Sequence, residues 1–427
     1  MSKKINFWSV FAIVTGSQIG ITIFVSPASL AKYGLYGLMG WLLSGIGAVA
    51  LCLVFAALCA RFPKTGGPHA YVNYAFGRSA AFFTGWTYWV VSWVSTTILV
   101  VASVGALSPF LGEISKTLDL TLQILLLLII TFLNLRGVSA AGKAEFILTL
   151  LKFIPLTIIP IVALFYFDPK NIAVANEVGQ LPLSSILSQV ILLTFFGFVG
   201  LESATTPAED VENPSKTIPK AIVSGTICVA LLYLLNSAAI FGVMPSQELA
   251  NSKAPYADAG KIIFGGNWYL LIALISSIIG VGCLNAWIIT SSQITLGLAQ
   301  DNLIPQKFAK KNKNGAPAFS IFISCLGVIP LLILTTNDNM AKQINSIIDF
   351  SVTAFLFVYL ACLAALIKFQ IKEKKTSLAS WLYIFIATIF CLWVIYETPA
   401  KSLLIASLFT CSGIPFYFLW YKNLRAN

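Results

Sequence analysis

Charged residues are scarce in this chain of 427 residues. Asp, Glu, Lys and Arg together make up 10% of it, histidine occurs once, and hydrophobic residues make up 58%. Soluble domains carry about 25% charged residues, so the composition indicates an integral membrane protein. The eight cysteines all lie in apolar stretches and form no Cys-x-x-Cys pair, which argues against a disulfide framework or a Cys/His metal site.

Motifs of catalysis are missing as well. The sequence has no Gly-Lys-Ser phosphate loop, no Gly-x-Ser-x-Gly elbow and no His-Glu-x-x-His metal motif. We therefore expect no enzyme, no cofactor and no metal. A channel would need a continuous polar pore lining, which the nearly uncharged stretches do not suggest. The net charge of +11 comes from basic residues scattered over many loops, a pattern that suits anionic lipid and not nucleic acid.

Long apolar runs dominate the sequence. A helix that spans a bilayer needs about 20 apolar residues, and twelve stretches approach that length. They centre on Ile19, Ala48, Val94, Leu128, Ile158, Phe196, Leu231, Ile279, Leu326, Phe357, Phe385 and Leu408. The fold class predicted is an all-α integral membrane protein with one transmembrane domain over residues 1–427 and twelve transmembrane helices.

The basic residues predict the orientation. If both termini are cytoplasmic, 19 of the 27 Lys and Arg residues lie in inner loops or termini, seven lie in outer loops, and Lys152 lies within a span. This bias follows the positive-inside rule and disfavours the inverted topology.

Two of the apolar stretches are interrupted by glycine at matching places. The first contains Gly16 and Gly20 in span 1, and the second contains Gly197 and Gly200 in span 6. Discontinuous helices at corresponding positions of two halves indicate the substrate site of a transporter. Spans 1–5 (residues 1–168) and spans 6–10 (183–370) are thus predicted to form two inverted five-helix repeats, with two additional helices in 376–427.

Two ionisable residues lie at membrane depth, where charge is costly and functional roles are the first hypothesis. Glu202 follows the second break and is a candidate proton carrier or gate latch; its alternative role is a structural cap near the interface. Lys152 could hold carbonyls of an unwound helix in place of a sodium ion; alternatively it extends to the headgroups.

Trp287 and His69 allow two readings each. Trp287 lies among small residues and could hold a cationic side chain by cation–π attraction, or it could serve packing alone. His69, in the loop between spans 2 and 3, could sense pH or be an ordinary interfacial residue. The surrounding Pro63 to Tyr71 segment is rich in helix breakers, which favours a short interfacial element.

Four segments together resemble a known family. They are Gly20-Ile21-Thr22-Ile23-Phe24-Val25-Ser26-Pro27, the loop from Pro63 to Gly77, Glu212 to Ile222 with its Asn-Pro…Pro-Lys-Ala-Ile run, and Asp301-Asn302-Leu303-Ile304-Pro305. The chain is similar to members of the amino acid–polyamine–organocation superfamily, and resembles the arginine/agmatine and putrescine/ornithine antiporters. The resemblance implies a LeuT-like fold with broken helices 1 and 6.

The resemblance also implies a site. The substrate carboxylate is expected at backbone N–H groups of Ile21, Thr22 and Ile23, next to Gly20, at a half-helix N-terminus. Its α-ammonium is expected at carbonyls of Ile19, Phe196 and Val199. Trp287, Thr96 and Ser351 complete the expected substrate-binding set. Tyr88, Tyr359 and Glu202 are expected to gate it, and Lys152 resembles the span-5 lysine of sodium-independent members.

Several positions depart from the family pattern. Ile21 and Thr22 replace Ser-Gly, Phe196 replaces a tryptophan, Thr96 replaces an asparagine, and His69 replaces a tyrosine. These changes leave the substrate open. We expect a sodium-independent amino acid/amine antiporter of the bacterial inner membrane, with lipid and a small molecule as partners and a homodimer through helices 11 and 12. The alternative is a proton-coupled symporter or exporter of neutral amino acids.

Overall fold

Helices account for nearly all of the structure. The computed structural model describes residues 4–20, 22–112, 114–252, 255–335, 340–374 and 377–425. Within these ranges the chain is 84% helix and has no strand, only an isolated bridge between Ile5 and Val211. The all-helical prediction is therefore confirmed.

The helices follow one another with short connections. In the first half they are α1 Phe7–Gln18, α2 Thr22–Ala31, α3 Leu35–Arg61, α4 Pro68–Phe76, α5 Arg78–Gly105, α6 Ser108–Leu111, α7 Lys116–Asn134, α8 Val138–Ala163, α9 Asn176–Gly179 and α10 Leu183–Phe195. In the second half they are α11 Pro214–Val243, α12 Ser246–Asn251, α13 Pro255–Phe264, α14 Trp268–Gln300, α15 Ala318–Thr335, α16 Met340–Glu373, α17 Leu378–Glu397, α18 Ala400–Cys411 and α19 Gly413–Arg425. Short 3-10 turns are η1 Leu164–Tyr166, η2 Pro169–Asn171, η3 Phe196–Phe198, η4 Ser203–Thr205, η5 Ala208–Asp210 and η6 Gln306–Ala309.

Eleven helical segments of the described chain are long and apolar enough to cross a membrane. They include α7 with 19 residues and α15 with 18, the two shortest. The predicted first span is absent from this set because it is divided into α1 and α2, which have 12 and 10 residues. The predicted interfacial segment between spans 2 and 3 is the nine-residue helix α4.

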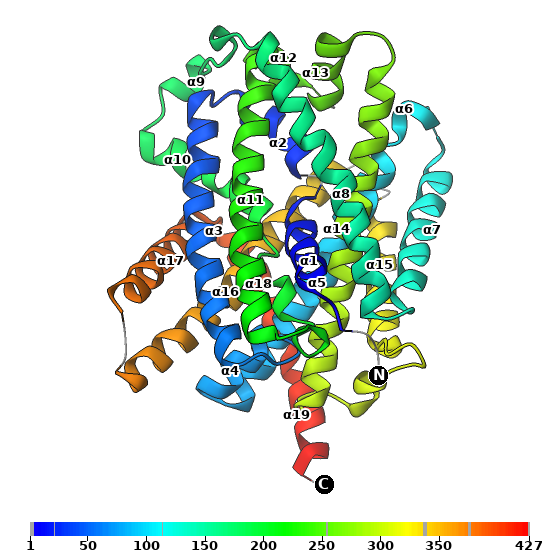
Figure 1. Ribbon diagram of the computed structural model, residues 1–427, viewed down its shortest axis with the longest axis vertical. Coiled ribbons are helices and arrows are strands. Elements are labelled where there is room, and N and C mark those ends of the chain that lie inside the picture. The colour runs from blue at the N-terminus through cyan, green and yellow to red at the C-terminus, as the bar shows by residue number, and fades with distance from the viewer. Residues whose placement is uncertain are drawn as a thin grey trace.

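The broken first segment lies in the middle of the bundle (Figure 1). There α1 packs against α8, α11 and α14. Around this centre α5 packs against α14 and α16, and α3 packs against α10, α11 and α17. Large apolar side chains on the outer helices, such as Leu128 and Phe132 of α7, are exposed, as expected for a surface that meets lipid chains.

Proline inside α8 shows how the bundle satisfies its backbone. Pro160 has no N–H and so cannot bond the carbonyl of Leu156, one turn earlier. The side-chain amide of Asn236 on α11 donates to that carbonyl at 2.7 Å. Because the hydrocarbon region holds little water, a freed carbonyl needs such a partner from a neighbouring helix.

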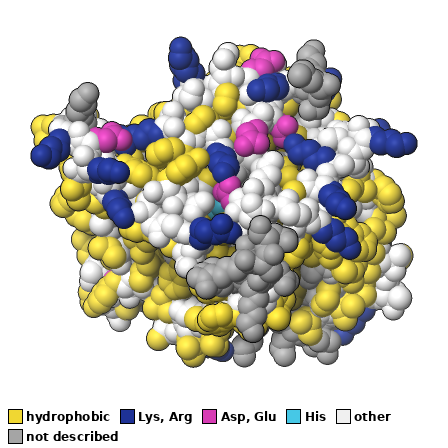
Figure 2. Space-filling model, turned by 90° about the horizontal axis from the view of Figure 1, so that it is seen from below, with side chains coloured by type: hydrophobic (Ala, Val, Ile, Leu, Met, Phe, Trp, Pro, Cys, Tyr) yellow, Lys and Arg dark blue, Asp and Glu magenta, His cyan; other side chains and the backbone are white. Residues whose placement is uncertain are grey.

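Both ends of the described chain lie at the same end of the bundle (Figure 1). The face at this end carries many Lys and Arg side chains and fewer acidic ones (Figure 2). Three ion pairs join elements here: Arg61 with Glu373 at 3.2 Å, Lys311 with Asp210 at 3.9 Å, and Lys64 with Asp301.

A polar clasp at this end connects the loop after α3 to the end of α14. Asp301 accepts a hydrogen bond from Lys64 and lies 3.2 Å from Nε2 of His69, which is fully buried. The same loop donates from the N–H of Gly66 to the carbonyl of Thr206 at 2.8 Å. His69 is thus a buried member of the clasp and not an ordinary interfacial residue.

The clasp also explains a glycine. Gly67 has a φ of +53°, and a Cβ there would lie 2.1 Å from Oγ1 of Thr205. Glycine therefore serves both the left-handed turn and the close approach of the loop to η4.

The ionisation of Asp301 follows from these contacts. Partial burial of its carboxyl opposes ionisation, but hydrogen bonds from His69 and Lys64 outweigh it and hold the pKa below its usual value. A group whose pKa is lowered by folding stabilises the fold above its unfolded pKa, and that contribution is lost as the pH falls through the folded pKa.

We therefore predict that Asp301→Asn lowers the free energy of unfolding by about 2 kcal/mol at neutral pH, since it removes charge-assisted bonds from a nearly buried carboxylate. The difference from wild type should shrink as the pH falls below about 4. Thermal unfolding in detergent over a pH series measures this.

The matched control is Glu373→Gln, which removes an ion pair whose side chains are 27% and 50% exposed. Exposed pairs contribute roughly 0 to 1 kcal/mol. Equal losses for the two variants, or a loss at Asp301 that does not depend on pH, would show that the clasp charge does not stabilise the fold.

Candidate functional site

The first interruption lies where α1 ends. The helix stops at Gln18, Ile19 has a non-helical ψ of 88°, and α2 begins at Thr22. The last carbonyls of a helix have no partner within it. Here the end is buried, so donors have to come from other elements.

Three helices supply those donors through side chains. The donors and acceptors are Lys152 Nζ to Gly16 O at 3.1 Å, Trp287 Nε1 to Ser17 O at 3.1 Å, and Tyr233 Oη to Gln18 O at 2.6 Å. These side chains belong to α8, α14 and α11. The end of α1 is therefore capped by residues of other helices.

The second interruption lies after α10. The chain continues as η3 through Phe198, Val199 is extended, and Gly200 has a φ of +102°. A Cβ at Gly200 would lie 2.9 Å from the ring of Trp287 and 3.0 Å from Oγ of Ser17. The Gly200 carbonyl accepts a hydrogen bond from Oγ of Ser17 at 2.9 Å. The interruptions predicted near Gly20 and Gly200 are thus present, and they touch each other.

A small cavity lies between the two interruptions. It has a volume of about 30 Å³ and is lined by Ser17, Gln18, Gly20, Thr22, Ser95, Ile98, Leu99, Phe196, Val199, Cys283 and Trp287. This volume suits one water molecule and is far below the roughly 300 Å³ at the lower end of small-molecule sites. The conformation is therefore closed, and an amino acid needs the surrounding helices to separate.

Five of the predicted substrate residues line this cavity: Gly20, Thr22, Phe196, Val199 and Trp287. Thr22 also begins α2, so its N–H and that of Ile23 belong to the first turn, where N–H groups have no acceptor within the helix. Ile21 lies outside the described residues. Ile19 and Ile23 are buried beside the break but are not among the lining residues.

Two further predicted residues lie behind the lining. The hydroxyl of Thr96 donates to the carbonyl of Trp93 on its own helix and does not line the cavity. Ser351 accepts from Ser95 Oγ at 2.8 Å, and it is Ser95 that reaches the cavity. Four lining residues were not predicted from the sequence: Ser17, Gln18, Ser95 and Cys283. Ser17 and Gln18 lie within the glycine-rich interruption, and that interruption could have indicated them.

The predicted gate residues converge on one carboxyl. Glu202 is fully buried, and its Oε2 accepts a hydrogen bond from Oη of Tyr359 at 2.5 Å. The same Tyr359 oxygen accepts from the N–H of Gly200 at 3.4 Å. Tyr88 is also buried, and its hydroxyl has no hydrogen-bond partner among the described residues. The carboxyl of Glu202 is therefore connected to the second interruption through the hydroxyl of Tyr359.

Lys152 is fully buried and reaches the end of α1, as its contact with Gly16 shows. Its second partner is Glu145, with Nζ and Oε1 3.3 Å apart. Glu145 is the last charged residue before Lys152 in the sequence, so it would be expected in the loop that precedes the span. That expectation is wrong: the residue lies seven positions inside α8 and is fully buried. The sequence also predicts a hydroxyl of span 8, such as Ser291 or Ser292, beside Lys152. Among the described residues the ammonium instead donates to Gly16 and Glu145, and Ser292 donates to the carbonyl of Ile289.

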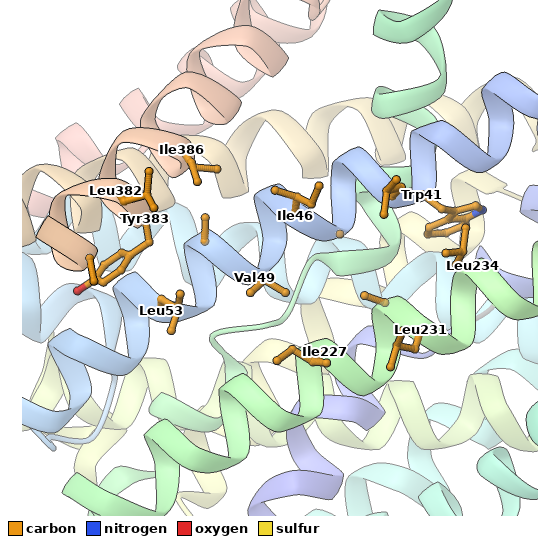
Figure 3. Close-up of a pocket in the computed structure, with 15 residues that line it drawn as sticks. Trp41, Ile46, Val49, Leu53, Ile227, Leu231, Leu234, Leu382, Tyr383 and Ile386 are labelled. Carbon is orange, nitrogen blue, oxygen red and sulfur yellow. The ribbon is translucent and has the colours of Figure 1, made fainter.

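A larger hollow elsewhere is unsuited to a charged substrate. It is a groove of about 630 Å³ between α3, α11 and α17, shown with its lining in Figure 3. Its labelled side chains include Leu53, Ile227 and Leu382, and no Asp, Glu, Lys or Arg lines it. Such a face suits lipid chains, so the small cavity at the interruptions is the candidate site.

The chemistry of the candidate site is that of binding. No group of three or more potential metal ligands occurs among the described residues. The cavity has beside it the first-turn N–H groups of α2, which suit an anion, and it is lined by Ser17 and Ser95 and by the aromatic residues Phe196 and Trp287, which suit a cation.

Comparison with known families agrees with this arrangement. The model of the amino acid permease family matches residues 5–418. This chain belongs to the amino acid permease family.

Known relatives of this permease align with most of its length. The putrescine transporter PotE of Haemophilus influenzae is 29% identical over 437 residues, covering 99% of this chain and 98% of that protein. PotE of Escherichia coli is 26% identical, covering 97% and 96%. The cadaverine/lysine antiporter of Escherichia coli is 29% identical, covering 80% of this chain and 77% of its own length. The superfamily resemblance seen in the sequence is confirmed.

We predict that Glu202→Gln flattens the pH dependence of transport by this permease between about pH 5 and pH 8, because glutamine keeps a hydrogen-bond partner for Tyr359 but cannot exchange a proton. Uptake into proteoliposomes at a series of pH values measures it, with thermal unfolding as the check on folding.

Glu209→Gln is the matched control, because this glutamate is exposed on the same segment. An unchanged pH profile in Glu202→Gln would reduce Glu202 to a structural cap.

Proposed function

We propose that this permease is a sodium-independent antiporter of the bacterial inner membrane that exchanges a cationic amino acid, such as arginine, ornithine or lysine, for its decarboxylated amine. The observation that carries this is the meeting of two helix interruptions at one closed cavity. The names of the relatives supply the substrate class, since one transports putrescine and another exchanges cadaverine and lysine.

The proposed architecture has twelve membrane crossings. The eleven candidate spans become twelve when α1 and α2 are taken together as one discontinuous crossing. Spans 1–5 and 6–10 then form two inverted LeuT-like repeats, each opening with an interrupted helix, and α17 with α18–α19 lie outside them. The basic face at the end that carries both termini supports a cytoplasmic position for that end.

In the proposed pose, backbone groups of the two interruptions bind the charged groups of the substrate. The α-carboxylate binds at the N-terminus of α2, at Thr22, Ile23 and the neighbouring Ile21. The α-ammonium binds at the carbonyls of Ile19, Phe196 and Val199. Thr96 and Ser351 lie behind the lining residue Ser95 and do not touch the substrate directly. A diamine lacks the carboxylate, so it uses the carbonyl end of the site and leaves the α2 end unoccupied.

The distal amine meets no acidic side chain, because the described residues that line the cavity include no Asp or Glu. Trp287 takes this role through its ring, since a desolvated cation over an aromatic face gains roughly 2 kcal/mol. The position of the ring is fixed, because its N–H donates to the carbonyl of Ser17 and the ring contacts that of Phe355, with centroids 5.2 Å apart and planes tilted by 57°.

The proposed cycle alternates access to this cavity. Contacts of Glu202 with Tyr359 close it on the side of the gate, and the contacts of Lys152 hold α1 against α8. Rocking of the interrupted helices relative to α5 and α14 opens one side at a time. A tethered ammonium at Gly16 removes the need for a sodium ion there.

A second candidate is a proton-coupled symporter or exporter of neutral amino acids. The absence of an acidic side chain from the described cavity lining favours it. We also propose a homodimer through α17, α18 and α19. This dimer is compatible with either candidate function.

Counterflow in proteoliposomes tests the function. Vesicles loaded with putrescine, cadaverine, ornithine, lysine, arginine or leucine are placed in sodium-free buffer with labelled substrate outside. The proposal expects uptake only into vesicles loaded with a cationic amino acid or its amine, unchanged by added sodium. Uptake that needs sodium, or that only leucine supports, contradicts it.

Trp287→Leu sharpens the result. Loss of the ring should raise the KM for cationic substrates about tenfold or more, and change that for leucine much less, because only a cation gains from the aromatic face. Phe195→Leu is the matched control, since this ring is buried and outside the cavity lining. Equal changes for lysine, ornithine and leucine favour the neutral-substrate candidate.

A further inference from the structure

Glu145 and Lys152 form an ion pair that is completely removed from the surface. Oε1 and Nζ lie 3.3 Å apart, and both side chains have 0% exposure. They lie two turns apart on α8, so both point toward the same side of that helix. Two unpaired charges here would each be very costly, so the pair has to be matched closely.

The neighbouring helices are shaped around this pair. A Cβ at Gly16 of α1 would lie 1.9 Å from Oε1 of Glu145, and a Cβ at Gly282 of α14 would lie 2.5 Å from Cε of Lys152. Each glycine therefore provides the space that one charged side chain fills. Any larger residue at either position would displace a member of the pair.

The carboxylate of Glu145 is held from several sides. Oε2 accepts from the side-chain amide of Asn285 at 2.8 Å, and Asn285 accepts in turn from Asn134 on α7 at 3.0 Å. Oε1 also accepts from the hydroxyl of Thr149 at 3.4 Å. These contacts leave the carboxylate facing Lys152 in one fixed arrangement.

The ammonium connects this cluster to the substrate site. Lys152 donates to Gly16, and the next carbonyl, that of Ser17, accepts from Trp287 and from the thiol of Cys283. Ser17, Trp287 and Cys283 all line the cavity. The ion pair is therefore one residue removed from the place where a substrate would bind.

We propose that Glu145 is a positioning residue for transport: its carboxylate holds the Lys152 ammonium on the Gly16 carbonyl and cancels its charge beside the cavity. This rests on the proposed function, because cancellation matters most when the substrate is itself a cation. With the pair intact, a cationic substrate meets a neutral neighbourhood. Without Glu145, it meets a fixed positive charge at membrane depth.

Glu145→Gln tests the charge directly, since glutamine retains the size and can still bond Asn285. The KM for ornithine, which has one net positive charge, should rise roughly tenfold, because unit charges about 10 Å apart interact to that extent at an effective dielectric constant near 20. The KM for putrescine, which has two positive charges, should rise more than that for ornithine. The KM for leucine, which has no net charge, should change less than about threefold. A purely structural role would change both substrates equally.

The double variant Glu145→Gln with Lys152→Met provides the decisive comparison. It removes both charges, so it should restore the KM for cationic substrates to within about threefold of wild type while the maximal rate stays low. Lys152→Met alone should slow exchange without raising that KM. A KM that stays high in the double variant overturns the proposal.

Stability gives a readout that does not depend on substrate. Each single variant leaves one buried charge without its partner, so the double variant should unfold at a higher temperature than either. Should Glu145→Gln fail to accumulate while the double variant accumulates, the pairing is supported. A double variant no more stable than Glu145→Gln contradicts it. If the wild type exchanges no cation, the proposed function fails, and the order of stabilities still decides whether the two charges are paired.

Discussion

The buried carbonyl groups at the end of α1 have to be satisfied without water, and the candidate site is arranged around that requirement. An interrupted helix inside a membrane is tolerated only where other protein groups or a cavity meet its backbone. Here α8, α11 and α14 supply donors to the end of α1, through Lys152, Tyr233, and both Trp287 and Cys283. The helix end is thus held in place by side chains that can also release it.

The two interruptions are coupled by very few atoms. Ser17 Oγ lies within hydrogen-bonding distance of the Gly200 carbonyl and of Ser203 Oγ, at 2.9 and 2.7 Å. The Gly200 N–H reaches Tyr359, which donates to Glu202. A displacement at either break therefore has to rearrange bonds at the other. This gives a physical basis for a gate that responds to the state of the cavity.

Much of this arrangement could be predicted, because charged residues are rare in the apolar spans and because glycines interrupt two of these spans at corresponding places. Glycine at positions 16, 20, 197 and 200 predicted both interruptions, and Lys152 was predicted at the end of α1. Which residues of a helix face the cavity was harder to predict. Ser95 lines the cavity and the adjacent Thr96 does not. Spacing along a helix cannot fix which of two neighbours faces inward until the packing of α5 is known.

The role of Glu145 could not be read from local pattern. A charge in the second turn of a helix, near a loop, is typical of a solvated helix end. Its burial depends on Gly16 and Asn285, which are distant in sequence and approach only in the folded bundle. His69 is similar, because its partner Asp301 lies 232 positions away. Glu145 and His69 can be identified in the sequence, but the residues that they contact cannot.

Substrate is proposed to bind between the two interruptions, and Cys283 offers the most direct test of this, because it lines the cavity there. A variant with Cys228 and Cys411 changed to serine removes the two cysteines that are not buried. Alkylation of Cys283 by a small maleimide, followed by mass spectrometry of its peptide, is then measured against substrate concentration. We predict that ornithine and putrescine slow this alkylation, and that the concentration of each that gives half of the effect equals its KM for transport. Alkylation at the same rate at every substrate concentration, in a variant that still transports, would contradict it.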